Sequence, residues 1–300
     1  MDVFITKLKC SRKGNKRITI QYQMSNQQKG LSRANTLENR EKYYTKPQTV
    51  NICMDKIRKH GFIQPNDCII EPSAGNGAFI HGIRELFPGN THIFMDIAPE
   101  HPDIQEGDFF EYTPGNNRTT TLHAIGNPPF GRQSSTAIRF IKHACLFCSS
   151  VSFILPKSFK KESMQKAFPL TFHMIEQCDL PPYSFSVNGE DHDVPCVFQV
   201  WVKREIPRVC IETPIPVGFA FVGKSDTPDI SLRRVGVYAG KIDTDTEKNE
   251  QSHYFIRFQN GKPVNENIGA LQRITFIHNN TVGPKSISKP EVIREFNKYL

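Results

Sequence analysis

The sequence predicts an α/β protein with a doubly wound, mostly parallel seven-stranded sheet, followed by a smaller β-rich C-terminal region. Two patterns support this fold class. Between residues 47 and 205, short apolar runs typical of buried strands alternate with segments of helical periodicity, and such alternation places helices on both faces of a parallel sheet. After residue 205 the alternation stops, and prolines separate aromatic-rich strand patterns such as 219–222 and 253–258.

The predicted elements follow one another in a regular order. The first helix begins at Pro47 and ends at His60-Gly61, because a basic last turn and a glycine mark a helix end. The seven strands are short apolar runs, expected over 67–71, 92–96, 102–105, 121–126, 150–155, 171–178 and 194–203. The other helices of this part are expected over 77–87, 134–148 and 161–168. A long polar loop is expected over 186–193.

Basic residues are concentrated at the N-terminus. The formal net charge is +8 over 300 residues, and residues 1–46 contain 11 Lys and Arg against 3 Asp and Glu. Because this segment has little apolar periodicity, we expect a basic, partly mobile arm over 1–42 that contacts a polyanion. The α/β domain is expected over 43–205 and the β-rich region over 206–300, with a final helix that a capping box opens at Ser288.

Cysteine usage and the N-terminus indicate an intracellular protein, cytoplasmic or nuclear and not secreted. No charged segment followed by an apolar run stands at the start of the sequence, and no run approaches the ~18 apolar residues of a membrane helix. Most of the eight cysteines lie in apolar runs, where we expect buried thiols. Cys145 and Cys148 form a C-x-x-C without a second ligand pair at zinc spacing, so no metal site is expected.

The first chemical motif is a glycine turn at the end of the first strand, Glu71-Pro72-Ser73-Ala74-Gly75-Asn76-Gly77. Rossmann-like sheets bind nucleotides at this position, where glycines allow the backbone to approach a ligand closely. Asp96 ends the second strand, 21 residues after Gly75, where a carboxylate would hold a ribose diol. Asp108 follows the third strand, where an adenine amine would lie. The alternative for both acids is a solvated strand end.

The second motif is Asn127-Pro128-Pro129-Phe130, which follows the strand 121–126. Two prolines fix the backbone and leave the Pro128 carbonyl without a local donor. The Asn127 amide oxygen and this carbonyl then form two rigid acceptors. They could hold both N–H groups of a planar amine and direct its lone pair toward an electrophile, while Phe130 offers a flat face for stacking. The motif therefore predicts alkyl transfer to a planar amino nitrogen.

Together these motifs resemble the class I S-adenosylmethionine-dependent methyltransferases that carry an N/D-P-P-F/Y/W tetrapeptide. The chain looks most like the adenine-N6 DNA methyltransferases, over roughly residues 43–202. Residues 71–77 match the pattern E-P-x-x-G-x-G, and 43–47 is similar to a Y-x-T-P segment in which Lys46 separates Thr45 from the proline. The resemblance implies S-adenosylmethionine as cofactor, nucleic acid as partner with DNA favoured over RNA, and the N6 amine of adenine as methyl acceptor.

The resemblance also implies roles for individual residues. Glu71 and Gly75 would line the methionine moiety, Asp96 would bind the ribose and Asp108 the cofactor adenine. Asn127 and Pro128 would hold the target amine, and Phe130 would stack on the target base. The implied cofactor-binding residues are Thr45, Glu71, Ser73, Gly75, Gly77, Asp96 and Asp108, and the implied catalytic residues are Asn127, Pro128, Pro129 and Phe130.

Three alternatives stay open at this point. The same tetrapeptide also resembles RNA adenine-N6 methyltransferases, and similar ones occur in enzymes that methylate protein glutamine. A catalytically inactive nucleic-acid-binding protein of the same fold is the third. For the region 206–300 we expect target recognition, because Arg233-Arg234 and the run 253–258 mix cations with aromatics, as phosphate contact beside base stacking requires. The alternative is a sheet with solvated charges and core aromatics.

Overall fold

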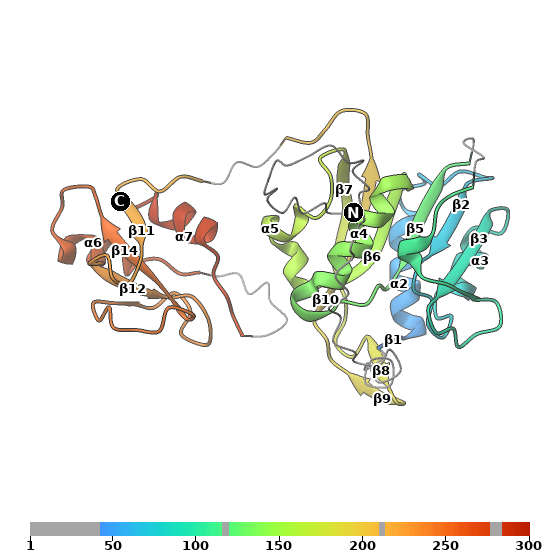
Figure 1. Ribbon diagram of the computed structural model, residues 1–300, viewed down its shortest axis with the longest axis horizontal. Coiled ribbons are helices and arrows are strands. Elements are labelled where there is room, and N and C mark those ends of the chain that lie inside the picture. The colour runs from blue at the N-terminus through green and yellow to red at the C-terminus, as the bar shows by residue number, and fades with distance from the viewer. Residues whose placement is uncertain (1–42, 116–119, 210–213, 277–283) are drawn as a thin grey trace, which may run out of the picture. The chain divides into compact units, whose positions relative to one another are not determined.

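The computed structural model describes residues 43–115, 120–209, 214–276 and 284–300 (Figure 1). The predicted N-terminal arm over 1–42 lies outside these residues. Among the described helices, none is both long and apolar enough to cross a membrane.

A seven-stranded sheet forms the centre of the first part of the fold (Figure 1). Its strands are β2 (Cys68–Glu71), β3 (Thr91–Asp96), β4 (Gln105–Glu106), β5 (Leu122–Gly126), β6 (Ser150–Pro156), β7 (Phe172–Asp179) and β10 (Cys196–Lys203). They stand in the order β4-β3-β2-β5-β6-β10-β7. The first five strands of this order, from β4 through β3, β2 and β5 to β6, pair in parallel with their neighbours. Strand β10 runs antiparallel to both β6 and β7. The predicted fold class, a doubly wound and mostly parallel seven-stranded sheet, is confirmed.

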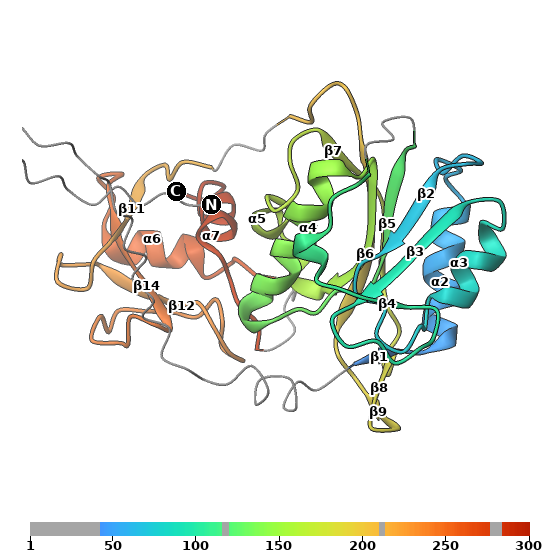
Figure 2. The same ribbon diagram turned by 45° about the vertical axis from the view of Figure 1, so that its right-hand side comes forward.

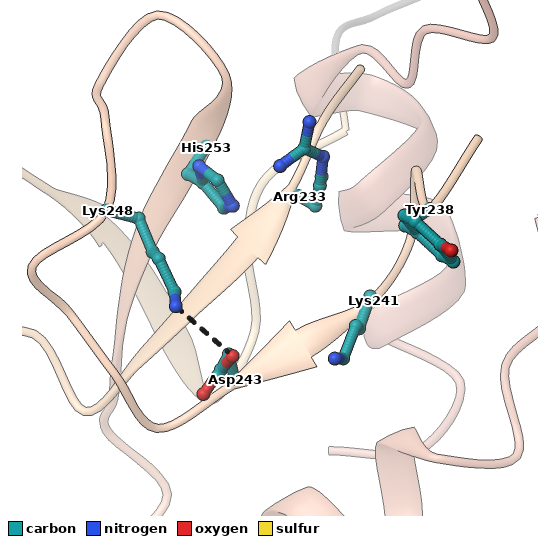
Figure 3. Close-up of a pocket in the computed structure, with 6 residues that line it drawn as sticks. All are labelled: Arg233, Tyr238, Lys241, Asp243, Lys248 and His253. Carbon is teal, nitrogen blue, oxygen red and sulfur yellow. Dashed lines mark ion pairs between the residues drawn. The ribbon is translucent and has the colours of Figure 1, made fainter. Parts of the chain in front are cut away.

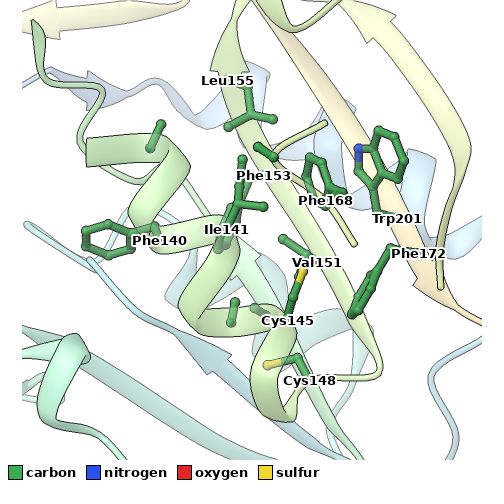
Figure 4. Packing of buried hydrophobic residues seen from close by; sticks show 14 of the residues in the cluster. Phe140, Ile141, Cys145, Cys148, Val151, Phe153, Leu155, Phe168, Phe172 and Trp201 are labelled. Carbon is green, nitrogen blue, oxygen red and sulfur yellow. The ribbon is translucent and has the colours of Figure 1, made fainter. Parts of the chain in front are cut away.

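Helices cover both faces of this sheet (Figure 2). They are α2 (Pro47–Arg58), α3 (Ile80–Leu86), α4 (Ser135–Phe147) and the short α5 (Glu162–Gln165), with single 3-10 turns η1 (Phe109–Glu111), η2 (Arg132–Ser134) and η3 (Lys157–Lys160). Neighbouring residues of β2 point to opposite faces. Ile70 packs with Ile141 of α4 in one buried cluster, and Ile69 packs with Met54 of α2 and Ile83 of α3 in the other. The first cluster also buries Cys145 and Cys148 of the C-x-x-C (Figure 4).

The expected polar loop over 186–193 is wrong, because these residues belong to a hairpin of β8 (Phe185–Val187) and β9 (Glu190–His192). Asn188 and Gly189 form its two-residue turn with φ of 50° and 84°. Asn-Gly is a strong sequence signal for this type of turn. The prediction missed the hairpin because most of its strand residues are polar. Strand β8 also pairs with β1 (Tyr44–Thr45), so the hairpin fixes the segment that precedes the first helix.

The C-terminal part is β-rich, as predicted. It contains the antiparallel strands β11 (Phe219–Val222), β12 (Ile230–Arg233), β13 (Ile242–Asp243) and β14 (His253–Phe258), in the order β11-β14-β12-β13, with helices α6 (Val264–Leu271) and α7 (Lys289–Phe296). Its buried cluster joins Ile230, Leu232 and Ile256 of the sheet to Val292 and Phe296 of α7. The capping box at Ser288 is confirmed, and the helix that follows it, α7, ends at Phe296. The domain boundary near residue 205 stays a prediction.

Substituting Gly189 with valine is expected to destabilise the hairpin. A Cβ at Gly189 would meet no atom within 4 Å, so the strain comes only from its φ of +84°, which a β-branched residue adopts poorly. We expect the free energy of unfolding in urea titrations to fall by about 1–2 kcal/mol. Asn188→Gly, at the neighbouring turn position, is the control and should change stability little. Equal stability of Gly189→Val and the wild type would contradict the strained turn.

Candidate active site

The candidate site lies where the winding of the sheet reverses. Strands β2 and β5 are parallel neighbours, although β3 and β4 separate them along the chain. Their carboxyl ends, Glu71 and Gly126, therefore lie at one edge of the sheet, beside the end of β3 at Asp96. In doubly wound sheets this reversal opens a crevice for a ligand, because the following loops leave in opposite directions.

The glycine turn after β2 is held by Asp96. The Gly75 N–H donates to Asp96 Oδ2 at 2.8 Å, and the Ala98 N–H donates to Oδ1 at 2.9 Å. Gly75 and Gly77 have φ of +53° and +84°, and a Cβ at Gly77 would lie 2.8 Å from the Ile80 side chain. Asp96 thus has a structural role that the sequence did not reveal. Each of its oxygens retains capacity to accept a second hydrogen bond.

Glu71 is a buried carboxyl, and one of its oxygens is unpaired among the described residues. Its side chain is 2% exposed, and Oε2 has no hydrogen-bond partner among the described residues. Burial, and secondly the negative charge of Asp96, raise the pKa of Glu71 well above its ordinary value. A Cβ at Gly126 would lie 3.1 Å from Glu71 Cγ, so the residue before Asn127 leaves room for this side chain. A cation bound beside this carboxyl would favour its ionised form.

Hydrogen bonds hold Asn127 in one orientation. Its Nδ2 donates to the Thr45 hydroxyl at 3.2 Å, and its main-chain carbonyl accepts from the Ser73 hydroxyl at 3.3 Å. Asn127 Oδ1 is buried and has no hydrogen-bond partner among the described residues. Thr45 is buried in β1, which β8 holds in place. The structure therefore places two of the seven predicted cofactor residues, Thr45 and Ser73, against Asn127. A direct contact between either of them and a cofactor stays a prediction.

The rest of the tetrapeptide is attached to α4. Pro128 is buried and Pro129 is exposed. The Phe130 carbonyl accepts the N–H groups of Thr136 and Ala137 at 3.1 and 3.2 Å, and its ring packs in part against both apolar clusters of the sheet. Gly131 follows with φ +68°. These contacts hold in place the backbone beside the two predicted acceptors, the Asn127 amide oxygen and the Pro128 carbonyl.

Asp108 lies two residues after β4, as predicted. The Gly107 N–H donates to the Asp96 carbonyl at 2.9 Å, which keeps this loop beside the end of β3. Asp108 is exposed, and its Oδ1 accepts from the Phe110 N–H at 2.9 Å, so it also begins the 3-10 turn η1.

Sequence reasoning missed Tyr44 and Glu100. The Tyr44 hydroxyl donates to Glu100 Oε2 at 2.7 Å, and the Glu100 N–H donates to the Gly75 carbonyl at 3.0 Å. A Cβ on Gly75 would lie 4.0 Å from the Tyr44 ring, so this ring lies against the glycine turn. Burial and the bond to Glu100 raise the pKa of Tyr44 to about 12. The only sequence signal was the position of Tyr44 next to Thr45.

Known structures with a similar fold are weakly similar to this chain. No protein-family model matches the sequence, and no curated protein matches it. A proposed RNA methyltransferase from Pyrococcus horikoshii is 16% identical over 55% of this chain and 87% of its own, with a TM-score of 0.43. The 23S rRNA methyltransferase ErmE is 14% identical over 56% and 72%, with a TM-score of 0.39. A type I restriction-modification methyltransferase subunit from Streptococcus thermophilus is 12% identical over 87% and 58%, with a TM-score of 0.42.

Glu71→Gln is expected to stabilise the protein increasingly as the pH rises. Because the pKa of Glu71 is higher in the folded protein than in the unfolded chain, wild-type stability falls as the pH rises through the raised pKa. Glutamine does not titrate. The stability of the variant relative to the wild type should therefore grow by up to about 1.4 kcal/mol per pH unit in urea titrations. Glu205→Gln, at an exposed residue, should show no such trend, and a trend equal in both variants would contradict a raised pKa at Glu71.

Proposed function

We propose that the protein is an S-adenosylmethionine-dependent methyltransferase that transfers a methyl group to the exocyclic N6 amine of adenine in nucleic acid, with DNA favoured. One observation carries this proposal. The unpaired Oδ1 of Asn127, in a rigid Asn-Pro-Pro-Phe segment, lies at the same sheet edge as a glycine turn that Asp96 holds. An acceptor for a planar amine therefore adjoins a nucleotide-type crevice.

The residues at this edge fit S-adenosylmethionine. Its sulfonium and ammonium groups are cationic, and Glu71 is a buried carboxyl with an unpaired oxygen, next to the negative charge of Asp96. Asp96 has acceptor capacity left for a ribose diol, Asp108 would bind the adenine, and Gly75 and Gly77 would let the backbone approach the ligand. When bound, this cofactor supplies an electrophilic methyl group.

The tetrapeptide would prepare the nitrogen of the target. In adenine the lone pair of the exocyclic amine is delocalised into the ring, which makes the amine a poor nucleophile. Asn127 Oδ1 and the Pro128 carbonyl would accept its two N–H groups and draw the nitrogen toward tetrahedral geometry, and Phe130 would stack on the base. The nitrogen loses a proton readily once it is alkylated, so no strong base is needed.

Nucleic acid is the substrate class that suits the charge of the chain. Residues 1–46 carry 11 of the 38 basic residues and only 3 acidic ones, and residues 201–300 carry 15 basic against 11 acidic residues. Basic residues outside the catalytic edge would hold the phosphates. A base within a duplex must be flipped out to reach the edge of the sheet. We favour DNA because the region after residue 205 is large enough for target recognition.

The decisive experiment is methyl transfer from tritiated S-adenosylmethionine to matched DNA and RNA pools, followed by nucleoside analysis. Label in N6-methyladenine of DNA would support the full proposal. Label only in RNA would overturn the preference for DNA, and labelled cytosine would overturn the choice of base. Calorimetry is the second measurement. If it detected no binding of S-adenosylmethionine to the wild type, the enzymatic proposal would fail as a whole.

Asn127→Ala should abolish methyl transfer while S-adenosylmethionine binds with nearly unchanged affinity in calorimetry. The substitution removes the proposed acceptor of the target amine, whereas the proposed cofactor contacts Glu71, Asp96 and Asp108 lie in β2, at the end of β3 and after β4. An equal loss of transfer and cofactor affinity would show that Asn127 has another role.

Thr45→Val should lower kcat about tenfold, the effect of one lost hydrogen bond, because Asn127 Nδ2 would lose its acceptor. Thr45 is a positioning residue in this proposal, so the cofactor affinity should stay unchanged and Thr45→Ser should restore kcat. Both kcat and the calorimetric affinity should be measured for each variant. Weaker cofactor binding at an unchanged kcat would instead favour Thr45 as a direct cofactor contact.

A further inference from the structure

A pocket of about 190 Å³ lies on the four-stranded sheet of the C-terminal part (Figure 3). Its lining residues are Arg233, Tyr238, Lys241, Asp243, Lys248 and His253. They come from β12, β13, the start of β14 and the turns that connect these strands. Nothing in the candidate active site involves them.

The strand register aligns three of these residues in one row. Arg233 of β12 pairs with His253 of β14. On its other side, the Arg233 N–H donates to the Lys241 carbonyl at 2.8 Å. Residues that pair across antiparallel strands point to the same face of a sheet. Since Leu232 belongs to the buried cluster, alternation along β12 places Arg233 on the opposite face, where the pocket lies.

The row brings like charges together, and only one carboxylate among the lining residues offsets them. Cations directly opposite each other on neighbouring strands are unfavourable. Asp243 is the only carboxylate among the residues that line the pocket, and Lys248 contacts it at 3.6 Å and Asp245 at 2.6 Å. Arg233 donates through Nε to the Val235 carbonyl at 3.1 Å. Neither Arg233 nor Lys241 forms an ion pair with a residue that the structure describes, so their charges suit an anion.

An exposed aromatic side chain adjoins these cations. Tyr238 lines the pocket from the turn between β12 and β13 and is 70% exposed, and its neighbour Val237 is 92% exposed. Gly236 and Gly240 shape this turn with φ of +95° and +103°. Nucleic acid offers an anionic phosphate and a flat base within one nucleotide, and cations beside an exposed aromatic residue match both. An inorganic anion would use only the cations.

The adjacent Arg234 lies on the other face of the sheet from the pocket. Its guanidinium carbon lies 5.1 Å from the centre of the Tyr254 ring, and Tyr254 packs against the buried cluster. The Nε atom of Arg234 is buried without a hydrogen-bond partner among the described residues. The sequence indicated Arg233 and Arg234 together as a recognition element. In the structure they have different surroundings, because Arg233 lines the pocket and Arg234 packs on an aromatic ring.

We propose that this pocket binds a phosphate group of the nucleic-acid substrate through Arg233 and Lys241, while Tyr238 stacks on an adjoining unpaired base. The proposal rests on the proposed function for the class of substrate. It adds a binding site outside the catalytic edge, with a chemistry that does not depend on the identity of the methylated base.

The test is fluorescence anisotropy with short labelled oligonucleotides, single-stranded and duplex, of DNA and of RNA, bound to the full chain without cofactor. Arg233→Gln/Lys241→Gln should lower the affinity about tenfold and reduce the slope of log affinity against log salt by about 1. Lys262→Gln/Arg273→Gln removes the same charge from exposed residues away from the pocket and should change both quantities less. Equal effects of the two double variants would overturn the proposal.

Tyr238→Ala is a second variant, at an exposed turn position that the core does not need. It should weaken binding of single strands about fivefold, and Tyr238→Phe should restore it because stacking needs only the ring. Unchanged binding by Tyr238→Ala would overturn the stacking role.

Inorganic phosphate distinguishes the source of the anion. If the double variant loses only thermal stabilisation by inorganic phosphate and keeps its affinity for oligonucleotides, the pocket binds a small phosphate and the assignment to nucleic acid fails.

The binding assay contains no cofactor, so its result is independent of methyl transfer. A wild type that binds oligonucleotides through the pocket but transfers no methyl group would contradict the proposed function alone. Loss of methyl transfer in Asn127→Ala, with the two double variants binding oligonucleotides equally, would support the proposed function and overturn the pocket.

Discussion

The hydrogen bond from the Gly75 N–H to the Asp96 carboxylate is the constraint on which the candidate site depends. It joins the loop after β2 to the end of β3 at 2.8 Å, and thereby fixes a backbone with left-handed glycines that no regular element supports. The Glu100 N–H then bonds to the Gly75 carbonyl, and Tyr44 bonds to Glu100. One carboxylate thus organises segments from three separate stretches of the chain. Its charge also contributes to the raised pKa of Glu71.

Two buried acceptors in the site are left without protein partners, and this arrangement favours ligand binding over stability. Glu71 Oε2 and Asn127 Oδ1 have no hydrogen-bond partner within the described residues. A buried unpaired polar atom destabilises a fold by about 1–3 kcal/mol. Substitution by apolar residues would avoid this cost. Polar atoms that are held rigid but unpaired are suited to groups that a ligand brings, since no protein bond must break first.

The sequence predicted the central strands β2, β5, β6 and β10 well because they are buried, and burial imposes apolar runs that can be read directly. It predicted the positions of Glu71, Asp96 and Asn127 because they come immediately after such runs. The bonds of Thr45 to Asn127 and of Tyr44 to Glu100 join residues 82 and 56 positions apart. No periodicity encodes such pairs. The hairpin at Asn188-Gly189 was missed because its strands lie partly exposed and read as polar.

The distribution of charge explains why phosphate-binding groups would be expected on a surface other than the candidate active site. Glu71, Asp96, Glu100 and Asp108 are all carboxyl groups around the crevice, and ionised carboxylates repel the phosphates of a nucleic acid. A cationic cofactor needs such groups, whereas a polyanionic substrate needs the opposite sign. Both requirements are met only if the two sets of charges occupy different surfaces. The row of Arg233 and Lys241 supplies cations on a sheet other than the one that carries Glu71 and Asp96.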